Sequence, residues 1–135
     1  MRTDVQGKLH FRLTFADVDS VQFFFADYYS WMERAFAELM AACGYSRRMA
    51  TKDRRGYPVV ESGCKYLKRA VCDDKLTVVA QFATMSERSF RIEYTFVHED
   101  NSVAATGFTQ HVCVDIDKMK ACPVPPLFVS KDEKA

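Results

Sequence analysis

Apolar side chains recur every third or fourth position between Tyr28 and Cys43, which is the spacing of one helix face. The apolar positions are Tyr28, Trp31, Met32, Ala35, Phe36, Leu39, Ala42 and Cys43. Polar residues fall between them, so the segment predicts an amphipathic helix of about four turns. Asp27 is expected to cap its N-terminus, and Gly44 is expected to end it in the left-handed conformation.

From Pro58 onward the pattern changes to runs rich in β-branched and aromatic residues, which are typical of strands. Four strands are predicted, at Val59–Leu67, Leu76–Ser86, Ser89–His98 and Ser102–Asp115. A leading strand is expected at Lys8–Phe15. The breaks between the later strands are short and polar, which favours antiparallel neighbours. A long apolar helix cannot bury its stripe alone, so we expect an α+β fold in which a curved antiparallel sheet of about five strands wraps around a long central helix.

Composition narrows the class of protein. The chain of 135 residues is expected to form a single domain over residues 1–135, and its net charge of +1 indicates neither a nucleic-acid nor a membrane partner. Its five cysteines form no CxxC pair, so reduced thiols in a cytoplasmic protein are expected, with no metal site. No apolar run approaches the roughly 20 residues of a membrane helix, and the N-terminus carries no signal-peptide pattern.

Two carboxylates, Asp17 and Asp19, lie two residues apart between the first strand and the helix. Alternation along a continued strand would point both side chains the same way. A polar turn between strand and helix explains the pair equally well. The spacing alone therefore leaves a catalytic and a structural interpretation open.

The stretch from Phe15 to Ala35, FADVDSVQFFFADYYSWMERA, resembles the signature of the 4-hydroxybenzoyl-CoA thioesterase family of hotdog proteins. The signature is matched at Phe15, Asp17, Asp19, Tyr28, Trp31, Glu33, Arg34 and Ala35, and further similar segments continue to Asp115. The resemblance implies a hotdog fold and an acyl-CoA thioesterase without a cofactor, coenzyme A being part of the substrate. It also implies a homodimer or homotetramer with active sites at the subunit boundary.

Within this resemblance the second aspartate of the pair, Asp19, is the catalytic carboxylate, and Asp17 is structural. The backbone N–H of Phe25 is the implied oxyanion donor. Substrate-binding residues are implied at Tyr28, Tyr57, Pro58 and Arg88, with Arg88 meeting the coenzyme A phosphates. Tyr57 and Pro58 are explained equally well as a turn that enters a strand.

The chemistry agrees with that assignment. A carboxylate near a helix N-terminus can attack a thioester or deprotonate the water that does so, and helix-end N–H groups can bind the oxyanion. The coenzyme A thiol, with a pKa near the 8.5 or so of cysteine, departs as thiolate with little acid assistance. The choice between nucleophile and general base stays open, as does that between an aromatic and a medium-chain acyl group.

Two other functions suit a hotdog fold. A dehydratase or hydratase needs a histidine near the helix start, and none of the three histidines lies there. A non-catalytic acyl-thioester-binding subunit stays open, because the turn from Ser20 to Gln22 lacks the family's glycine and is one residue short. Asp27 would also place a second negative charge near the oxyanion.

Overall fold

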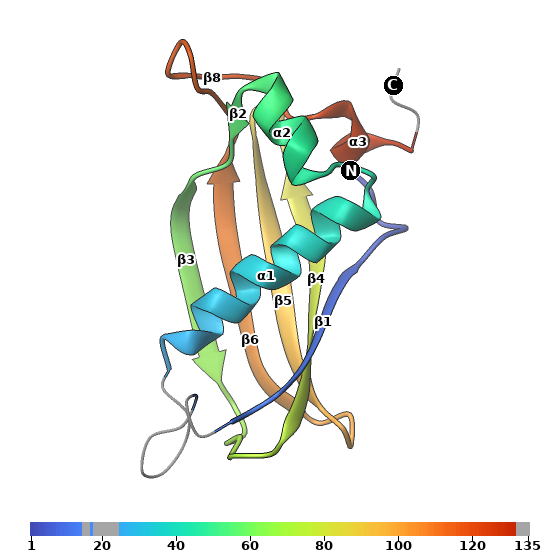
Figure 1. Ribbon diagram of the computed structural model, residues 1–135, viewed down its shortest axis with the longest axis vertical. Coiled ribbons are helices and arrows are strands. Elements are labelled where there is room, and N and C mark those ends of the chain that lie inside the picture. Colours follow the sequence, from blue (N-terminus) through green and yellow to red (C-terminus); the bar gives the residue numbers. More distant parts are fainter. Residues whose placement is uncertain (15–16, 18–24, 132–135) are drawn as a thin grey trace.

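A curved antiparallel sheet wraps around one long helix in the computed structural model, which describes residues 1–14, 17 and 25–131 (Figure 1). The helix is α1, Asp27–Ala42. The sheet consists of β1 (Gly7–Arg12), β3 (Val59–Tyr66), β4 (Lys75–Met85), β5 (Ser89–His98) and β6 (Val103–Val112). Its strand order is β1-β4-β5-β6-β3, so β1 and β3 are its edges. The predicted α+β class, with a central helix and five strands, is confirmed.

Short elements gather at the end of the sheet where α1 ends (Figure 1). They are α2 (Arg47–Asp53), β2 (Arg55–Gly56), β7 (Val114–Asp115), β8 (Lys120–Ala121) and α3 (Pro126–Val129). The strands β2, β7 and β8 form a small sheet in the order β2-β7-β8. None of the three was predicted as a separate strand, and neither short helix was predicted, because such elements are too short to establish a period.

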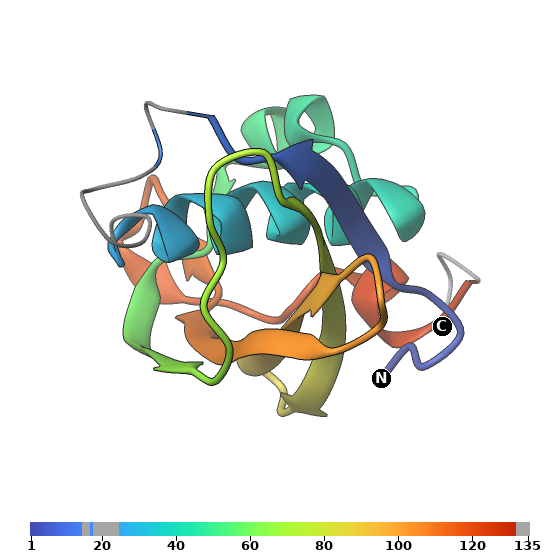
Figure 2. The ribbon, with the colours of Figure 1, turned by 90° about the horizontal axis from the view of Figure 1, so that it is seen from below.

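Helix α1 buries one stripe against the inner face of the sheet, which curls around it (Figure 2). The buried residues are Tyr28, Trp31, Met32, Ala35, Phe36 and Leu39, as the periodicity predicted, whereas Ala42, which was predicted in the same stripe, is exposed. The predicted cap is wrong: Asp27 is the first helical residue, and the N-cap, Ala26, makes no side-chain hydrogen bond. A carboxylate at this first position is still favoured by the helix dipole. Gly44 has a φ of 81°, which confirms its predicted left-handed role.

The strands alternate between a buried and an exposed face. In β5, Ile92, Tyr94 and Phe96 are buried under the helix, whereas Glu93 is exposed on the outer face. The ladder register shifts in β3, β4 and β5, at Val59/Glu61, Phe82/Thr84 and Phe96/Val97. Irregularities of this kind increase local twist, which suits a sheet that curls around a helix.

Arg2 is buried at the end of α1, although the sequence shows no pattern there. Its guanidinium donates to the carboxylate of Asp4 at 3.0 Å, and to the carbonyls of Cys43 at 3.3 Å and Leu127 at 3.4 Å. Those carbonyls lie at the C-cap of α1 and within α3, near helix ends where carbonyls lack intrahelical partners. The hydrogen bond from Arg2 is the main cause that lowers the pKa of Asp4 to about 2. The N-terminal segment is thus held across two helix ends.

All five cysteines are free thiols. Cys113 and Cys122 come closest, with their sulfur atoms 3.3 Å apart.

Within the described part of the chain, no helix has the length and apolar character needed to span a membrane. The cytoplasmic location stays a prediction.

Gly7 marks a close approach between β1 and α1. A Cβ atom there would lie 2.6 Å from the carbonyl oxygen of Ala35 and would overlap the backbone nitrogen of Leu39. Gly7→Ala should therefore push strand and helix apart and lower the free energy of unfolding, measured by urea denaturation, by about 1–3 kcal/mol or more.

Gly56→Ala is the matched control, because its Cβ would lie 3.7 Å from Ile116, an ordinary contact. Its free energy of unfolding should change by less than about 1 kcal/mol. If both variants lost the same free energy of unfolding, the proposed role of the Gly7 contact would be contradicted.

Candidate active site

The turn that leads into α1 is tied to the end of β3. The carbonyl of Phe25 accepts a hydrogen bond from the backbone N–H of Tyr28 at 3.3 Å and another from the hydroxyl of Tyr66 at 3.2 Å. Because Tyr66 is the last residue of β3, the start of the helix and the end of the edge strand are held together. This end of the molecule carries two of the predicted residues, Phe25 and Tyr28.

Aromatic rings wall a small cavity at this end. The ring of Tyr28 is buried and packs edge-to-face on Tyr66, with centroids 4.7 Å apart, and lies 4.9 Å from Phe96. The cavity measures about 160 Å³ and is lined by Phe25, Tyr28, Tyr66, Leu67, Lys68, Arg69 and Ala70. Burial raises the pKa of Tyr66 to about 12, so its hydroxyl stays protonated and able to donate at neutral pH.

Of the carboxylates, the structure describes Asp17 and Asp27, while Asp19 lies outside the described residues. Asp17 accepts hydrogen bonds from the backbone N–H of Thr14 at 2.9 Å and from its hydroxyl at 3.0 Å, which agrees with the predicted structural role. Burial, and then the negative charge of Asp17, raise the pKa of Asp27. Negative potential therefore concentrates beside the helix start, on both sides of the segment that carries Asp19.

Tyr57, Pro58 and Arg88 lie at the opposite end of the molecule, beside the short elements (Figure 1). The Tyr57 hydroxyl donates to that of Tyr45 at 2.6 Å, and burial raises the pKa of Tyr57. The carbonyl of Pro58 accepts from the N–H of Val112 at 3.2 Å, and the side chain of Arg88 is exposed. Since the 16 residues of α1 span about 24 Å, one chain keeps these residues apart from Phe25 and Tyr28.

A chain of buried hydrogen bonds links Tyr94, Thr109, His111 and Tyr57. The carbonyl of Tyr57 can only accept, so Nδ1 of His111, 2.9 Å away, carries a proton. Nε2 then accepts from the Thr109 hydroxyl at 2.8 Å, and Thr109 accepts from Tyr94 at 2.8 Å. Burial lowers the pKa of His111, which agrees with a neutral core residue. In the part of the chain that the structure describes, no cluster of three or more His, Cys, Asp or Glu could hold a metal ion.

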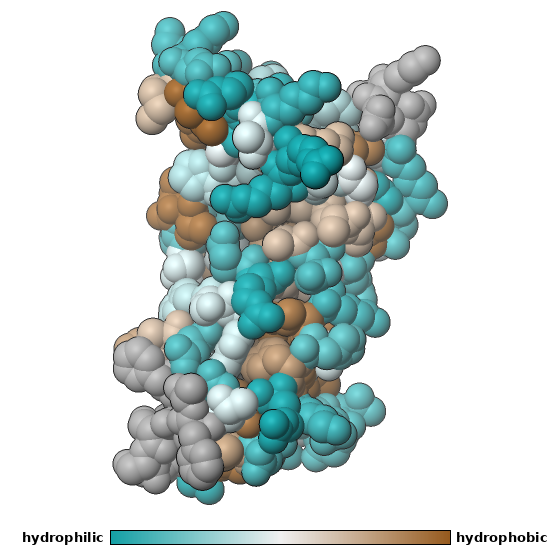
Figure 3. All heavy atoms as spheres, in the orientation of Figure 1, coloured by the Kyte–Doolittle hydropathy of each residue, from teal (hydrophilic) through white to brown (hydrophobic). Residues whose placement is uncertain are grey.

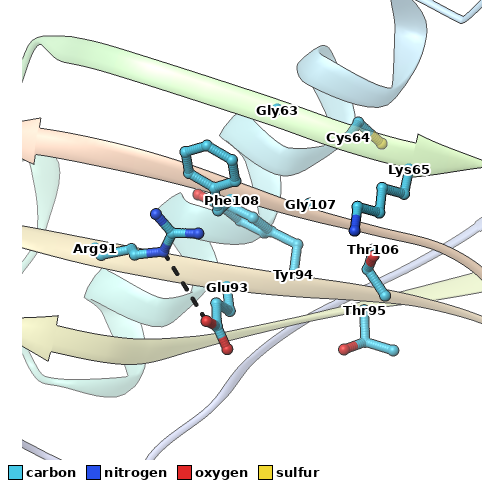
Figure 4. A pocket seen from close by; sticks show the side chains of 10 residues that line it. All are labelled: Gly63, Cys64, Lys65, Arg91, Glu93, Tyr94, Thr95, Thr106, Gly107 and Phe108. Carbon is cyan, nitrogen blue, oxygen red and sulfur yellow. Dashed lines mark ion pairs between the residues drawn. The ribbon is translucent and has the colours of Figure 1, made fainter.

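A wider hollow of about 530 Å³ lies on the outer face of the sheet, away from α1 (Figure 4). Two cations, Lys65 and Arg91, line it. The guanidinium of Arg91 lies 3.8 Å from the centre of the Phe108 ring and 3.9 Å from the carboxylate of Glu93. The hollow contains none of the predicted site residues. It is therefore a surface feature separate from the helix start.

Comparison with known proteins identifies the family. A family model described as the Thioesterase-like superfamily matches residues 13–131. The chain belongs to this superfamily. It is 26% identical over 124 residues to a 1,4-dihydroxy-2-naphthoyl-CoA hydrolase of Thermosynechococcus vestitus, which covers 90% of this chain and 82% of the relative. A hydrolase of the same name from Synechococcus elongatus is 28% identical over 116 residues, which cover 84% of this chain and 85% of that one.

Solved structures share the fold of this thioesterase-like protein. A gentisyl-coenzyme A thioesterase superposes with a TM-score of 0.82 at 25% identity, over 91% of this chain and 99% of the other. A 1,4-dihydroxy-2-naphthoyl-CoA thioesterase from Synechocystis gives a TM-score of 0.83 at 19% identity, over 94% and 95% of the two chains, which supports the fold alone. The predicted hotdog fold and the thioester-hydrolase class are therefore confirmed.

Tyr66 is the residue of this site that sequence reasoning missed. Its place at the end of a predicted strand gave no reason to single it out, because its hydrogen bond to Phe25 depends on where the helix starts in space. The pairing of Tyr45 with Tyr57 was missed for the same reason. The roles predicted for Asp19, Phe25, Tyr28, Tyr57, Pro58 and Arg88 stay predictions.

The buried histidine gives this thioesterase-like protein a pH-dependent stability. Because the pKa of His111 is lowered in the folded state, the unfolded state binds a proton more readily, and the free energy of unfolding should fall as the pH drops below about 6.5. His111→Gln should cost about 1–3 kcal/mol at pH 7.5 and flatten that slope in urea denaturation between pH 5 and 7.5.

The exposed strand residue His10 supplies the control, since His10→Gln should keep the slope of the unsubstituted protein. An unchanged slope in His111→Gln would rule out the buried histidine as its source.

Proposed function

We propose that this protein hydrolyses an acyl-CoA thioester with an aromatic acyl group. The observation that carries the proposal is the aromatic-walled cavity at the start of α1, next to the segment that bears Asp19. Tyr28 and Tyr66 form a rigid edge-to-face pair there, which suits a planar ring. The relatives named above for aromatic CoA thioesters point to the same substrate class.

In the proposed reaction, Asp19 attacks the thioester carbonyl or takes a proton from the attacking water. The backbone N–H of Phe25 donates to the oxyanion, and the dipole of α1 favours the developing charge. The C–S bond then breaks and coenzyme A leaves as thiolate. If water is the nucleophile, the free acid forms directly; if Asp19 is the nucleophile, an acyl–Asp19 anhydride remains, and its hydrolysis by water releases the acid and restores the carboxylate. The hydroxyl of Tyr66 supports the reaction by holding the carbonyl of Phe25, and with it the turn that carries the donor.

A homodimer is part of the proposal, because β3 is an edge strand that exposes apolar side chains. The exposed apolar side chains from β3 and the residue after it are Val59, Val60, Tyr66 and Leu67. Figure 3 shows hydrophobic side chains on this edge, near the start of β3. None of the described residues of β1, the other edge, is a large apolar side chain left exposed. Exposed apolar edge strands invite pairing, so β3 is the expected interface.

The symmetry of such a dimer would unite the separated residues. A two-fold axis that pairs two β3 edges antiparallel must stand perpendicular to the sheet, which keeps both helices on the same face. The start of α1 in one protomer then lies beside Tyr57, Pro58 and Arg88 of its partner. Each of the two resulting sites would contain Asp19 and Phe25 from one protomer and the opposite-end residues from the other.

The proposal predicts the effect of removing the carboxylate. Asp19→Asn should lower kcat on the preferred acyl-CoA by about 10²–10⁴-fold, because the general base or nucleophile is lost while the fold is kept. Asp17→Asn, which alters only the hydrogen bonds that the carboxylate accepts from Thr14, should lower kcat much less. Thiol release measures the rates on 1,4-dihydroxy-2-naphthoyl-CoA, gentisyl-CoA, and short, medium and long straight-chain acyl-CoAs.

Full activity of a folded Asp19→Asn variant would remove Asp19 from the mechanism. Faster hydrolysis of every straight-chain ester than of the aromatic ones would contradict the aromatic assignment. Absence of turnover on the whole panel would favour the non-catalytic acyl-thioester-binding subunit.

The dimer predicts a second result. Val60 is 62% exposed on β3, and Val60→Asp would place a charge at the pairing edge. We expect the variant to sediment as a monomer at micromolar concentration and to lose most activity, because each site would lack its partner's residues. Val129→Asp, at an apolar position exposed on α3, should leave mass and activity unchanged. A fully active monomer would overturn the shared site.

A further inference from the structure

Helix α2 carries three cations and one carboxylate, Asp53, and none of the three cations forms an ion pair within the described part of the chain. The side chains of Arg47, Arg48 and Lys52 are exposed and make no hydrogen bond or ion pair with the residues that the structure describes. The following arginines differ: Arg54 pairs with Asp117 at 2.9 Å, and Arg55 donates to the carbonyl of Pro123 at 2.8 Å. Figure 3 shows hydrophilic side chains over α2, at the upper end of the view.

The arrangement is unfavourable for the helix itself. Arg47 and Arg48 occupy the first turn, where the helix dipole disfavours positive charge, and no acidic residue lies in that turn. Arg48 and Lys52 are four residues apart, so two like charges are neighbours on one helix face. Met49 and Ala50 point the other way and pack against the core. These cations destabilise their own helix and have no anionic partner within the described part of the chain. We therefore expect an anionic partner outside the chain.

The position of α2 identifies that partner. Helix α2 follows the end of α1 and lies on the same face of the sheet (Figures 1 and 2). In the antiparallel dimer proposed above, it therefore lies beside the start of its partner's α1. We infer that Arg47, Arg48 and Lys52 of one protomer bind the nucleotide phosphates of the CoA thioester whose carbonyl reacts beside Asp19 of the other protomer. The inference rests on the proposed dimer and extends the site beyond Arg88.

The chemistry suits a CoA tail. Its phosphate groups are polyanionic, and guanidinium groups bind phosphate oxygens in paired, charge-assisted hydrogen bonds. At the other end of the molecule, two cations, Lys68 and Arg69, line the small cavity. The ammonium of Lys68 is occupied by Asp100 at 3.3 Å and by Ser102 at 2.8 Å, which leaves one unpaired cation there against three on α2. The unpaired cations of α2 are therefore the better phosphate ligands.

Binding of free coenzyme A tests the inference without relying on hydrolysis. In calorimetry, the triple variant Arg47→Gln, Arg48→Gln, Lys52→Gln should raise the Kd of CoA by about tenfold or more. Added salt should weaken CoA binding to the unsubstituted protein more than CoA binding to the variant. A control triple with the same charge change, Lys8→Gln, Arg34→Gln, Lys75→Gln, alters exposed cations elsewhere that make no hydrogen bond or ion pair with the described residues, and it should leave Kd unchanged. Equal Kd values in the α2 variant and the unsubstituted protein, or no CoA binding by either, would overturn the inference.

Hydrolysis then separates this inference from the proposed function. The α2 variant should raise KM for the CoA ester about tenfold or more but leave KM unchanged for the N-acetylcysteamine ester of the same acid, which has no phosphate. A raised KM for both esters would mean that α2 acts on something other than the nucleotide. If neither ester is hydrolysed while CoA binding still depends on α2, the proposed function fails and the phosphate site stands.

A mixed dimer tests whether α2 acts across the interface. Co-expression with two tags yields a dimer of one Asp19→Asn protomer and one α2-neutralised protomer. If α2 serves its partner's site, the intact Asp19 is matched with an intact α2, and KM for the CoA ester equals that of the unsubstituted dimer. If α2 served its own protomer, KM would be raised as in the α2 variant, which would refute the cross-interface assignment.

Discussion

The fold depends on burying one apolar helix stripe against one curved sheet. Helix and sheet approach so closely that two sheet positions have no room for a side chain: a Cβ at Gly7 would overlap the backbone of α1, and one at Gly107 would lie 2.5 Å from the sulfur of Met32. Contacts this close define the path of α1 along the sheet. They place its first turn beside the end of β3 and its last turn beside α2, about 24 Å away. A substrate site that needs both ends must therefore form between two protomers.

Helix and strands each bury one face, and this explains how much of the fold could be predicted from the sequence. The helix boundaries were predicted within one residue and those of β5 without error, because each repeats its period over ten or more residues. Helix α2 has seven residues, too few for a period, and Arg2 is buried only because carbonyls far along the chain meet it. The sequence names candidate site residues, whose roles stay predictions, but does not show that they lie at two ends of the molecule. That division follows from strand order and direction, which a pattern of apolar positions does not specify.

The charges of the two ends differ in a way that the net charge hides. Beside the start of α1, Lys68 is paired with Asp100, and hydrogen bonds from Ser102 and Lys68 lower the pKa of that carboxyl. Asp17 and Asp27 add negative charge to the same end. The α2 end keeps unpaired cations. Two protomers placed antiparallel would set the acidic end of each beside the basic end of the other, so the same asymmetry favours both association and an anionic substrate between them.

In the proposed dimer, Tyr66 would connect assembly with catalysis. It is the last residue of the edge strand expected to pair in the dimer, its ring is a wall of the aromatic cavity, and its hydroxyl holds the carbonyl of Phe25. A partner strand along β3 would restrain the backbone of Tyr66 and, through that hydroxyl, the turn that carries the proposed oxyanion donor. A separated protomer would lose its partner's residues and also the support of its own turn. Association is thus expected to act on kcat as well as on substrate binding, because the strand proposed to form the interface also holds the start of α1 through the hydroxyl of Tyr66.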